Sequence, residues 1–315
     1  MTLDENASSV LEKLDEILVR VARIEKALNI VPDRELEVSD SNQSIQTYEV
    51  FAKEDLGLEE NTIQNQKSAI QSFLQHSSNK INEQSVKAYL DTNPSPAWKT
   101  NQLKALRRYI RDFLKLGKWI EGFEFERTGP RIHKEYPNNE KLAEFFYVLP
   151  ADSQVIFLVL LSSGLRPGEV LGLKVKDVNF DDGINMVDAS NMHQGKTKYS
   201  WMSFITNEAA EVLLEYLFGT GILSSPGSTI FPLPIRTLQE HFKDASEKTG
   251  IDVTPKLLRK VFADRCERTG ISKKYIDAFC GRTPRGVLES HYTDYSPSRL
   301  REEYNKAEPL LALEI

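Results

Sequence analysis

Four side chains that could together transfer a phosphoryl group lie within residues 254–295. Lys256 and Arg259 are three residues apart, so a helix would carry both on one face. Arg282 follows a Cys-Gly pair, and Tyr292 comes ten residues after it. Cations stabilise negative charge as it develops on a phosphate, and a hydroxyl can attack phosphorus. The stretch therefore predicts a site that transfers DNA strands without a metal ion.

Each of these residues also has a more ordinary interpretation. Lys256 and Arg259 could form one exposed helix face, and Arg282 could cap the helix that ends before it. Tyr292 competes with Tyr295 for the role of nucleophile, and a tyrosine near the C-terminus usually packs its ring. The functional interpretation therefore depends on all of the residues occurring together, in order and at a fixed spacing.

Composition describes an ordinary globular protein with room for two domains. The chain has 315 residues, of which 27% are charged and 40% hydrophobic. No apolar run reaches the roughly 18–20 residues that a membrane span needs. Cys266 and Cys280 are the only cysteines, and they form no C-x-x-C pair. We therefore expect a cytoplasmic protein with free thiols, no metal and no cofactor.

The net charge of −6 and the pI of about 5.6 argue against a nucleic-acid partner, but the charges are segregated. Acids are concentrated in the first forty residues. Between Lys87 and Lys118, Asp91 and Asp112 are the only acids among many cations. A merely solvated helix face normally mixes both signs, so we favour phosphate contacts there. The candidate DNA-binding residues are Lys99, Lys104, Arg107, Arg108, Arg111 and Lys115.

The pattern divides the chain into three parts. Residues 1–30 carry an a/d seam of apolar residues that predicts a coiled-coil oligomerisation helix, although a helix lying on its own domain is the alternative. A linker is expected at 31–43, a helical DNA-binding domain at 44–122, and a second linker at 123–137. Residues 138–315 would form the catalytic domain, with an apolar tail that docks on a neighbour or, as the alternative, on its own domain.

The second domain should be mostly helical with one small β element. Two β-prone runs, MVDAS and YSWMSFI, flank a polar stretch that contains Lys196 and Lys198 and predicts a hairpin. The run VIFLVLL is apolar enough to be a buried helix. The expected fold class is therefore mainly α, with two helical domains and a small sheet.

Three motifs resemble those of the tyrosine recombinases, or phage integrases. SSGLRPGEVLGLKVKDV contains Arg166, TPKLLRKVFAD contains Arg259, and FCGRTPRGVLESHYTDY contains Arg282 and Tyr292. Lys256 stands where the family commonly has His, Arg282 replaces another His, and the spacing to Tyr292 is one residue longer. These departures are similar to the fusellovirus-type integrases of archaeal viruses and plasmids. The motifs cover about 155–308, while residues 44–122 more loosely resemble the family's SAM-like core-binding domain.

The resemblance implies a role for each residue. Arg166, Arg259 and Arg282 would hold the scissile phosphate, with Glu169 supporting the site. Tyr292, preferred over Tyr295 on its spacing, would attack and form a 3′-phosphotyrosine. Lys198, or alternatively Lys196, would protonate the leaving oxygen. Lys256 would either take the tyrosine's proton or hold the phosphate. His291 is expected to be a supporting residue that forms hydrogen bonds beside the nucleophile, with contact to the phosphate as the alternative.

The sequence thus predicts a site-specific recombinase or integrase of an archaeal mobile element. It would act on double-stranded DNA at attachment sites, as a homotetramer that passes through a Holliday junction, with no membrane partner. A type IB topoisomerase uses a similar residue set but would work as a monomer. A DNA-binding regulator of recombinase ancestry could dispense with the tyrosine or the arginines.

Overall fold

The computed structural model describes residues 36–125, 135–180, 185–192, 201–282, 286 and 291–315. The predicted coiled coil at 1–30 and the hairpin lysines Lys196 and Lys198 lie outside these ranges. The chain forms two compact units, Met1–His133 and Lys134–Ile315. The boundary between the units falls in the stretch that the sequence predicts as the second linker.

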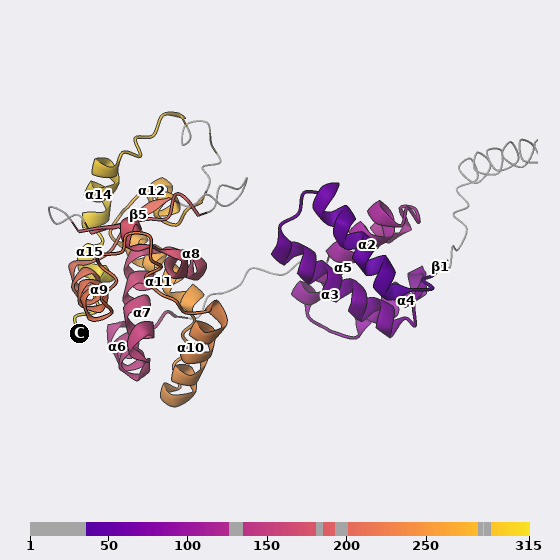
Figure 1. The fold of residues 1–315 in the computed structure, drawn as a ribbon, viewed down its shortest axis with the longest axis horizontal. Helices are drawn as coiled ribbons and strands as arrows, with labels where there is room; N and C mark the ends of the chain where they lie inside the picture. Colours follow the sequence, from indigo (N-terminus) through magenta and orange to yellow (C-terminus); the bar gives the residue numbers. More distant parts are fainter. Residues whose placement is uncertain (1–35, 126–134, 181–184, 193–200, 283–285, 287–290) are drawn as a thin grey trace, which may run out of the picture. The chain divides into compact units, whose positions relative to one another are not determined.

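The first unit is a group of helices around one apolar core (Figure 1). Its α-helices are α2 (Ser41–Glu54), α3 (Glu60–His76), α4 (Glu83–Asp91) and α5 (Pro96–Arg107). Each of α2, α4 and α5 is preceded by an N-cap residue whose side chain accepts a hydrogen bond from the first turn: Asp40, Asn82 and Ser95. The largest side chains of the core are aromatic: Tyr48, Phe73 and Tyr109.

The described part of the predicted first linker belongs to this unit. Strand β1 (Leu36–Glu37) pairs antiparallel with β2 (Lys80–Ile81), and α2 begins within the predicted linker, at Ser41. Val38 is 8% exposed and its N–H donates to Asn79 O at 3.0 Å. This apolar contact and the short ladder bring residues 36–43 into the fold, so the sequence prediction placed the domain start too late.

The helix that carries most of the cations between Lys87 and Lys118 does not stay α-helical to its end. Helix α5 continues into a π-helical turn, η1 (Arg108–Phe113). The turn ends because Lys115 and Gly117 adopt left-handed backbone conformations, with φ of 56° and 98°. A 3₁₀ turn, η2 (Trp119–Gly122), then runs back towards the end of α5, which brings Glu121 beside the cations of η1.

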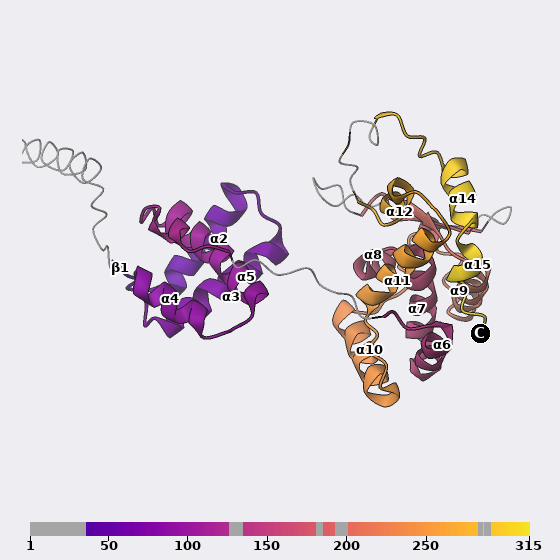
Figure 2. The same cartoon turned by 180° about the vertical axis from the view of Figure 1, so that it is seen from behind.

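The second unit is built around α7 (Ala151–Ser163), whose residues from Val155 to Ser163 are all buried. Helices α6 (Asn139–Val148), α9 (Asn207–Gly219) and α11 (Pro255–Arg268) pack against α7, and α10 (Ile235–Thr249) packs on α6 (Figure 1 and Figure 2). The short helices α8 (Pro167–Gly172) and α12 (Lys273–Phe279) pack against α7 and α11, respectively. The prediction that VIFLVLL forms a buried helix is confirmed.

A three-stranded antiparallel sheet lies in the second unit, in the order β3 (Val178–Asn179), β4 (Met186–Asp188) and β5 (Met202–Phe204). A 3₁₀ turn, η3 (Val175–Asp177), leads into it. Strands β4 and β5 pair with Met186 opposite Phe204 and Asp188 opposite Met202. These are the two runs that the sequence pattern predicted to pair, so the small β element and the mainly helical fold class are confirmed.

The C-terminal tail follows α14 (Pro297–Asn305) and α15 (Glu308–Leu311) and packs against its own domain. Leu311 and Leu313 are buried, and the carboxylate of Glu208 accepts hydrogen bonds from Leu313 N at 2.8 Å and Ile315 N at 2.9 Å. Glu208 lies in the first turn of α9, where free N–H groups favour an acid. In this chain the tail thus packs on its own domain, the arrangement that the sequence analysis gives as the alternative, and docking on a neighbour stays a prediction.

Within the described ranges no helix is long and apolar enough to cross a membrane. The same residues contain no group of His, Cys, Asp and Glu side chains that could hold a metal ion.

Candidate active site

Arg166 is held in place by Glu169 at the start of α8. Its Nη1 donates to Glu169 Oε1 at 2.7 Å, and its backbone N–H donates to Glu169 Oε2 at 2.7 Å. Glu169 is 2% exposed, so this carboxylate has little access to water and depends on those donors. Arg166 Nη2 also donates to Gly281 O at 3.0 Å. The predicted supporting role of Glu169 agrees with this geometry.

The turn before Arg166 requires glycine. Gly164 ends α7 with φ of 68°, and a Cβ at this position would overlap the ring of Phe262. The close approach brings α7 and α11 together at this end. As a result Arg259 Nη1, on α11, reaches Gly164 O at 2.8 Å.

Arg259 is partly buried, as is Arg166, whereas Arg282 is exposed. Besides Gly164 O, Arg259 donates through Nη2 to Cys280 O. Burial lowers the pKa of Arg259, and the positive charges of Arg166 and Arg282 act in the same direction. Arg166 and Arg282 are therefore close enough to Arg259 for their charges to disfavour its protonated form, an arrangement that an anion would relieve.

Arg282 directly follows Cys280 and Gly281, whose carbonyl groups accept from Arg259 and Arg166. Its N–H donates to Asp277 O at 2.8 Å, and its Nη1 donates to Asp277 Oδ1 at 2.5 Å. Its side chain is 51% exposed, so it can reach solvent or a ligand more readily than Arg259. The three arginines come from parts of the sequence up to 116 residues apart and meet at Cys280–Arg282.

Lys256 lies one turn before Arg259 and is exposed. It borders a hollow of about 350 Å³ together with Pro167, the residue after Arg166, and with residues of α10. The described part of the chain contains no ion pair for Lys256. It is thus available to a ligand on the side where α8 begins.

The two candidate nucleophiles differ in their surroundings. Tyr292 is 78% exposed, and His291 beside it is exposed as well. The ring of Tyr295 is half-buried, with its centroid 6.1 Å from that of Tyr275 and 6.2 Å from that of Trp201. The structure therefore leaves Tyr292 free to meet a substrate and engages Tyr295 in packing.

The first unit has a hollow of about 820 Å³ bordered by Lys104, Arg107, Arg108 and Arg111. Most of its lining comes from α3, α5 and η1, and α5 also contributes Trp98, Asn101 and Gln102. Its lining is cationic and polar, which suits a phosphate backbone and base edges. No ion pair of Lys104 or Arg108 occurs among the described residues.

The other predicted DNA-binding residues are placed differently. Arg107 donates to Glu121 O and Phe123 O and lies 4.3 Å from the Phe125 ring centroid, so it holds η2 and the segment after it. Arg111 pairs with Asp112 and Glu121.

Lys99 borders a separate, smaller hollow, 3.8 Å from Asp91. Lys115 lies beside Phe51, with its Nζ 6.0 Å from the ring centroid. The expectation of one acid-poor cationic face is therefore wrong for part of the set, because Glu121 returns to Arg111 from a later turn.

The sequence prediction missed several partners of the arginines. Asp277 lies five residues before Arg282, a spacing that belongs to no helix face and gives no pattern. The carbonyl groups of Gly164 and Cys280 have no sequence signal at all. Only the fold shows that these groups orient Arg259.

The comparisons with known proteins agree with the geometry. The sequence model of the Phage integrase family matches residues 138–299. Tyrosine recombinase XerA of Saccharolobus solfataricus is 27% identical over 206 residues, which covers 64% of this chain and 67% of that protein. Tyrosine recombinase XerC of Pelobacter propionicus is 23% identical over 242 residues, or 70% and 76% of the two chains.

Solved structures share the fold. A lambda integrase dimer bound to a COC′ core site superposes with a TM-score of 0.62 at 18% identity, over 87% of this chain and 80% of that one. The XerH site-specific recombinase bound to palindromic difH, in a post-cleavage complex, gives a TM-score of 0.57 at 18% identity, over 84% of each chain.

Proposed function

The chain belongs to the phage integrase family and is a tyrosine recombinase, and on this premise we propose that it cleaves and rejoins duplex DNA through Tyr292. The observation that carries the proposal is that Arg166 and Arg259 donate to the carbonyl groups of Gly281 and Cys280, directly before Arg282, whose own side chain binds Asp277. A set of guanidinium groups with an exposed tyrosine ten residues away supplies both charge neutralisation and a nucleophile.

The reaction follows from these groups. Tyr292 Oη attacks the phosphorus of a DNA phosphodiester, and the bond to the 5′-oxygen breaks. The negative charge on the non-bridging oxygens is stabilised by the arginines, which bind such oxygens in pairs. Lys198, or Lys196, gives a proton to the leaving 5′-oxygen, and Lys256 either takes the tyrosine's proton or binds the phosphate.

The product is a 3′-phosphotyrosine and a free 5′-hydroxyl. The energy of the broken bond is kept in the protein–DNA linkage, so a 5′-hydroxyl of another strand can reverse the reaction without nucleotide hydrolysis. The mechanism therefore exchanges strands rather than degrading them.

Finer assignments belong to the same proposal. The substrate is an attachment site, strand exchange passes through a Holliday junction, and four protomers assemble on the DNA with residues 1–30 as a coiled coil. The first unit binds duplex DNA through Lys104 and Arg108. The protein serves a mobile element of the archaeal virus or plasmid type and acts at the host nucleoid; Lys256 and Arg282 in place of the usual histidines support this assignment.

A suicide-substrate assay tests the function. A duplex with a nick beside the attachment site loses the short strand after cleavage, so the covalent protein–DNA adduct accumulates. The wild type should give a slowly migrating, protease-sensitive adduct, Tyr292→Phe should give none, and Tyr295→Phe should retain it. Loss of the adduct in Tyr295→Phe but not in Tyr292→Phe would identify Tyr295 as the nucleophile. No adduct from the wild type would favour the DNA-binding regulator instead.

A further inference from the structure

Tyr292 lies between two residues, Arg282 and Tyr295, that both contact one short helix, α12. On the N-terminal side Arg282 binds Asp277 of α12 through its side chain and its backbone. On the C-terminal side the Tyr295 ring packs edge-on against Tyr275 of α12, with an interplanar angle of 76°. Tyr275 and Asp277 thus connect the two ends of the segment to one platform.

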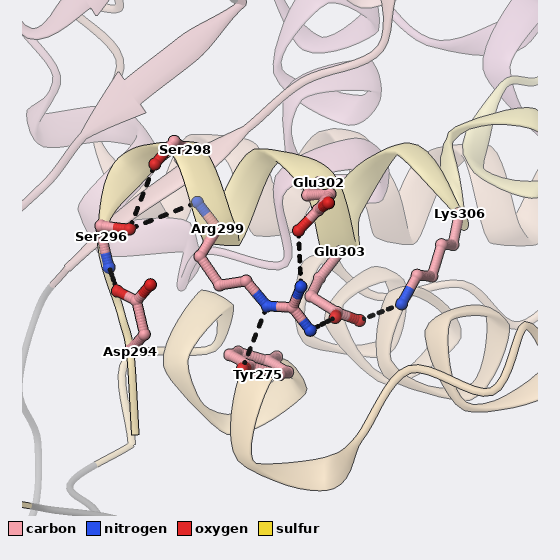
Figure 3. A network of polar contacts seen from close by, with 8 residues as sticks. All are labelled: Tyr275, Asp294, Ser296, Ser298, Arg299, Glu302, Glu303 and Lys306. Carbon is pink, nitrogen blue, oxygen red and sulfur yellow. Dashed lines mark hydrogen bonds and ion pairs between the residues drawn. The ribbon is translucent and has the colours of Figure 1, made fainter. Parts of the chain in front are cut away.

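Arg299, in the first turn of α14, holds Tyr275 from another direction (Figure 3). Its Nε donates to Tyr275 Oη at 3.3 Å, and its Cζ lies 5.6 Å from the ring centroid. Its Nη2 donates to Glu303 at 2.6 Å, and Lys306 binds the other oxygen of this buried carboxylate at 2.7 Å. Trp201, Tyr275, Tyr295 and Arg299 therefore form one contact group, which we call the aromatic clamp.

The short connection between Tyr292 and the clamp is stiffened by hydrogen bonds. Asp294 Oδ1 accepts from Ser296 N at 2.8 Å, and Ser296 Oγ caps α14 by accepting from Arg299 N at 3.4 Å (Figure 3). The chain thus makes a tight turn between the nucleophile and α14. These two bonds connect Asp294, which directly precedes Tyr295, to the start of α14.

Chain length decides which attachment controls the nucleophile. An extended chain spans at most about 3.3–3.6 Å per residue. Tyr292 is ten residues after Arg282, so that attachment alone would allow about 35 Å of separation. It is three residues before Tyr295, which confines its Cα to within about 11 Å of the clamp.

We propose that the aromatic clamp sets the position of Tyr292 relative to the arginines, with Tyr275, Tyr295 and Arg299 as positioning residues that need not touch DNA. The inference rests on the proposed function of Tyr292 as nucleophile. An attacking oxygen must lie close to phosphorus and in line with the leaving group, and small displacements slow such reactions strongly. Loss of the clamp should slow cleavage without weakening DNA binding.

Single-turnover cleavage of the suicide substrate at saturating protein tests the clamp, with the DNA dissociation constant measured separately. Tyr295→Leu and Arg299→Gln should cleave about 10–100-fold more slowly with unchanged DNA affinity. Tyr295→Phe should cleave at close to the wild-type rate, because it keeps the ring. Lys306→Ala is the matched control: it removes another contact of Glu303 but none with Tyr275, and it should leave the rate unchanged.

Each other outcome overturns the inference. Wild-type rates in folded Tyr295→Leu and Arg299→Gln would show that the clamp does not position Tyr292. A rate in Tyr295→Phe as low as in Tyr295→Leu would place the hydroxyl, rather than the ring, in the mechanism. A loss confined to DNA affinity would make these residues DNA contacts.

If Tyr295→Leu fails to fold, Arg299→Gln carries the test, because the Arg299 side chain is 39% exposed and its removal leaves the core intact. Failure of the proposed function would be seen separately, as absence of any adduct in the wild type.

Discussion

Replacement of Arg259 by lysine should damage both stability and catalysis. Arg259 donates to Gly164 O and to Cys280 O, and both residues are buried. An ammonium group carries its donors at one point and cannot reach both carbonyl groups in this geometry. One buried carbonyl then loses its partner, at a cost of about 1–3 kcal/mol. For a unit the size of Lys134–Ile315, this lowers Tm by roughly 2–12 °C.

The catalytic loss in Arg259→Lys should be about 10²–10³-fold, which is typical for removal of one donor that stabilises developing charge. Arg282→Lys is the matched control, since Arg282 is half exposed and its side chain makes an ion pair with Asp277. An exposed pair contributes about 0–1 kcal/mol, so Tm should fall by only a few degrees while cleavage still slows. Thermal unfolding and suicide-substrate cleavage of both variants give the comparison. An unchanged Tm in Arg259→Lys, or an equal loss in both, would refute the reasoning.

Three further predictions concern other parts of the chain. Replacing Lys104 and Arg108 by alanine should weaken DNA binding and lower the slope of log affinity against log salt by about one per lost phosphate contact. An unchanged slope in fluorescence anisotropy titrations would contradict the assignment of these residues to phosphate binding. Glu169→Gln should lower Tm and slow cleavage, because Glu169 accepts hydrogen bonds from Arg166 through both carboxylate oxygens and glutamine has only one acceptor oxygen. A variant with the wild-type Tm and cleavage rate would count against this role of Glu169. Burial raises the pKa of Tyr48 to about 12 from 10. The stabilising contribution of its protonated hydroxyl is therefore complete below pH 10 and is lost as the pH rises through 12. Tyr48→Phe should show a shallower fall of Tm over that range than the wild type, and an equal fall would refute the assignment.

Elements with a strong local pattern could be predicted from the sequence. The apolar run of α7 has no polar face, and such a helix has to be buried. The two β-prone runs pair with each other as expected. Tyr292 was preferred over Tyr295 on spacing alone, and the exposed position of Tyr292 and the packed ring of Tyr295 support that preference.

The remaining features depend on contacts between distant residues. Arg107 and Arg111 have the same sequence pattern as Lys104 and Arg108, yet Glu121 and Phe123 return from a later turn and engage them. A run of cations therefore cannot be assigned to DNA before the fold is known.

The C-terminal tail illustrates the same limit. Its leucines indicate that it packs on something, but the carboxylate of Glu208 that receives it lies more than a hundred residues earlier. The sequence therefore left two acceptors open, the tail's own domain and a neighbouring protomer.

Identification of the DNA-linked residue tests the central claim most directly. The adduct formed on a suicide substrate is digested with protease and nuclease, and the peptide that retains a nucleotide 3′-phosphate is sequenced by mass spectrometry. The account predicts that the nucleotide is attached to Tyr292. Attachment to Tyr295 or to any other residue, or linkage through a 5′-phosphate, would contradict it.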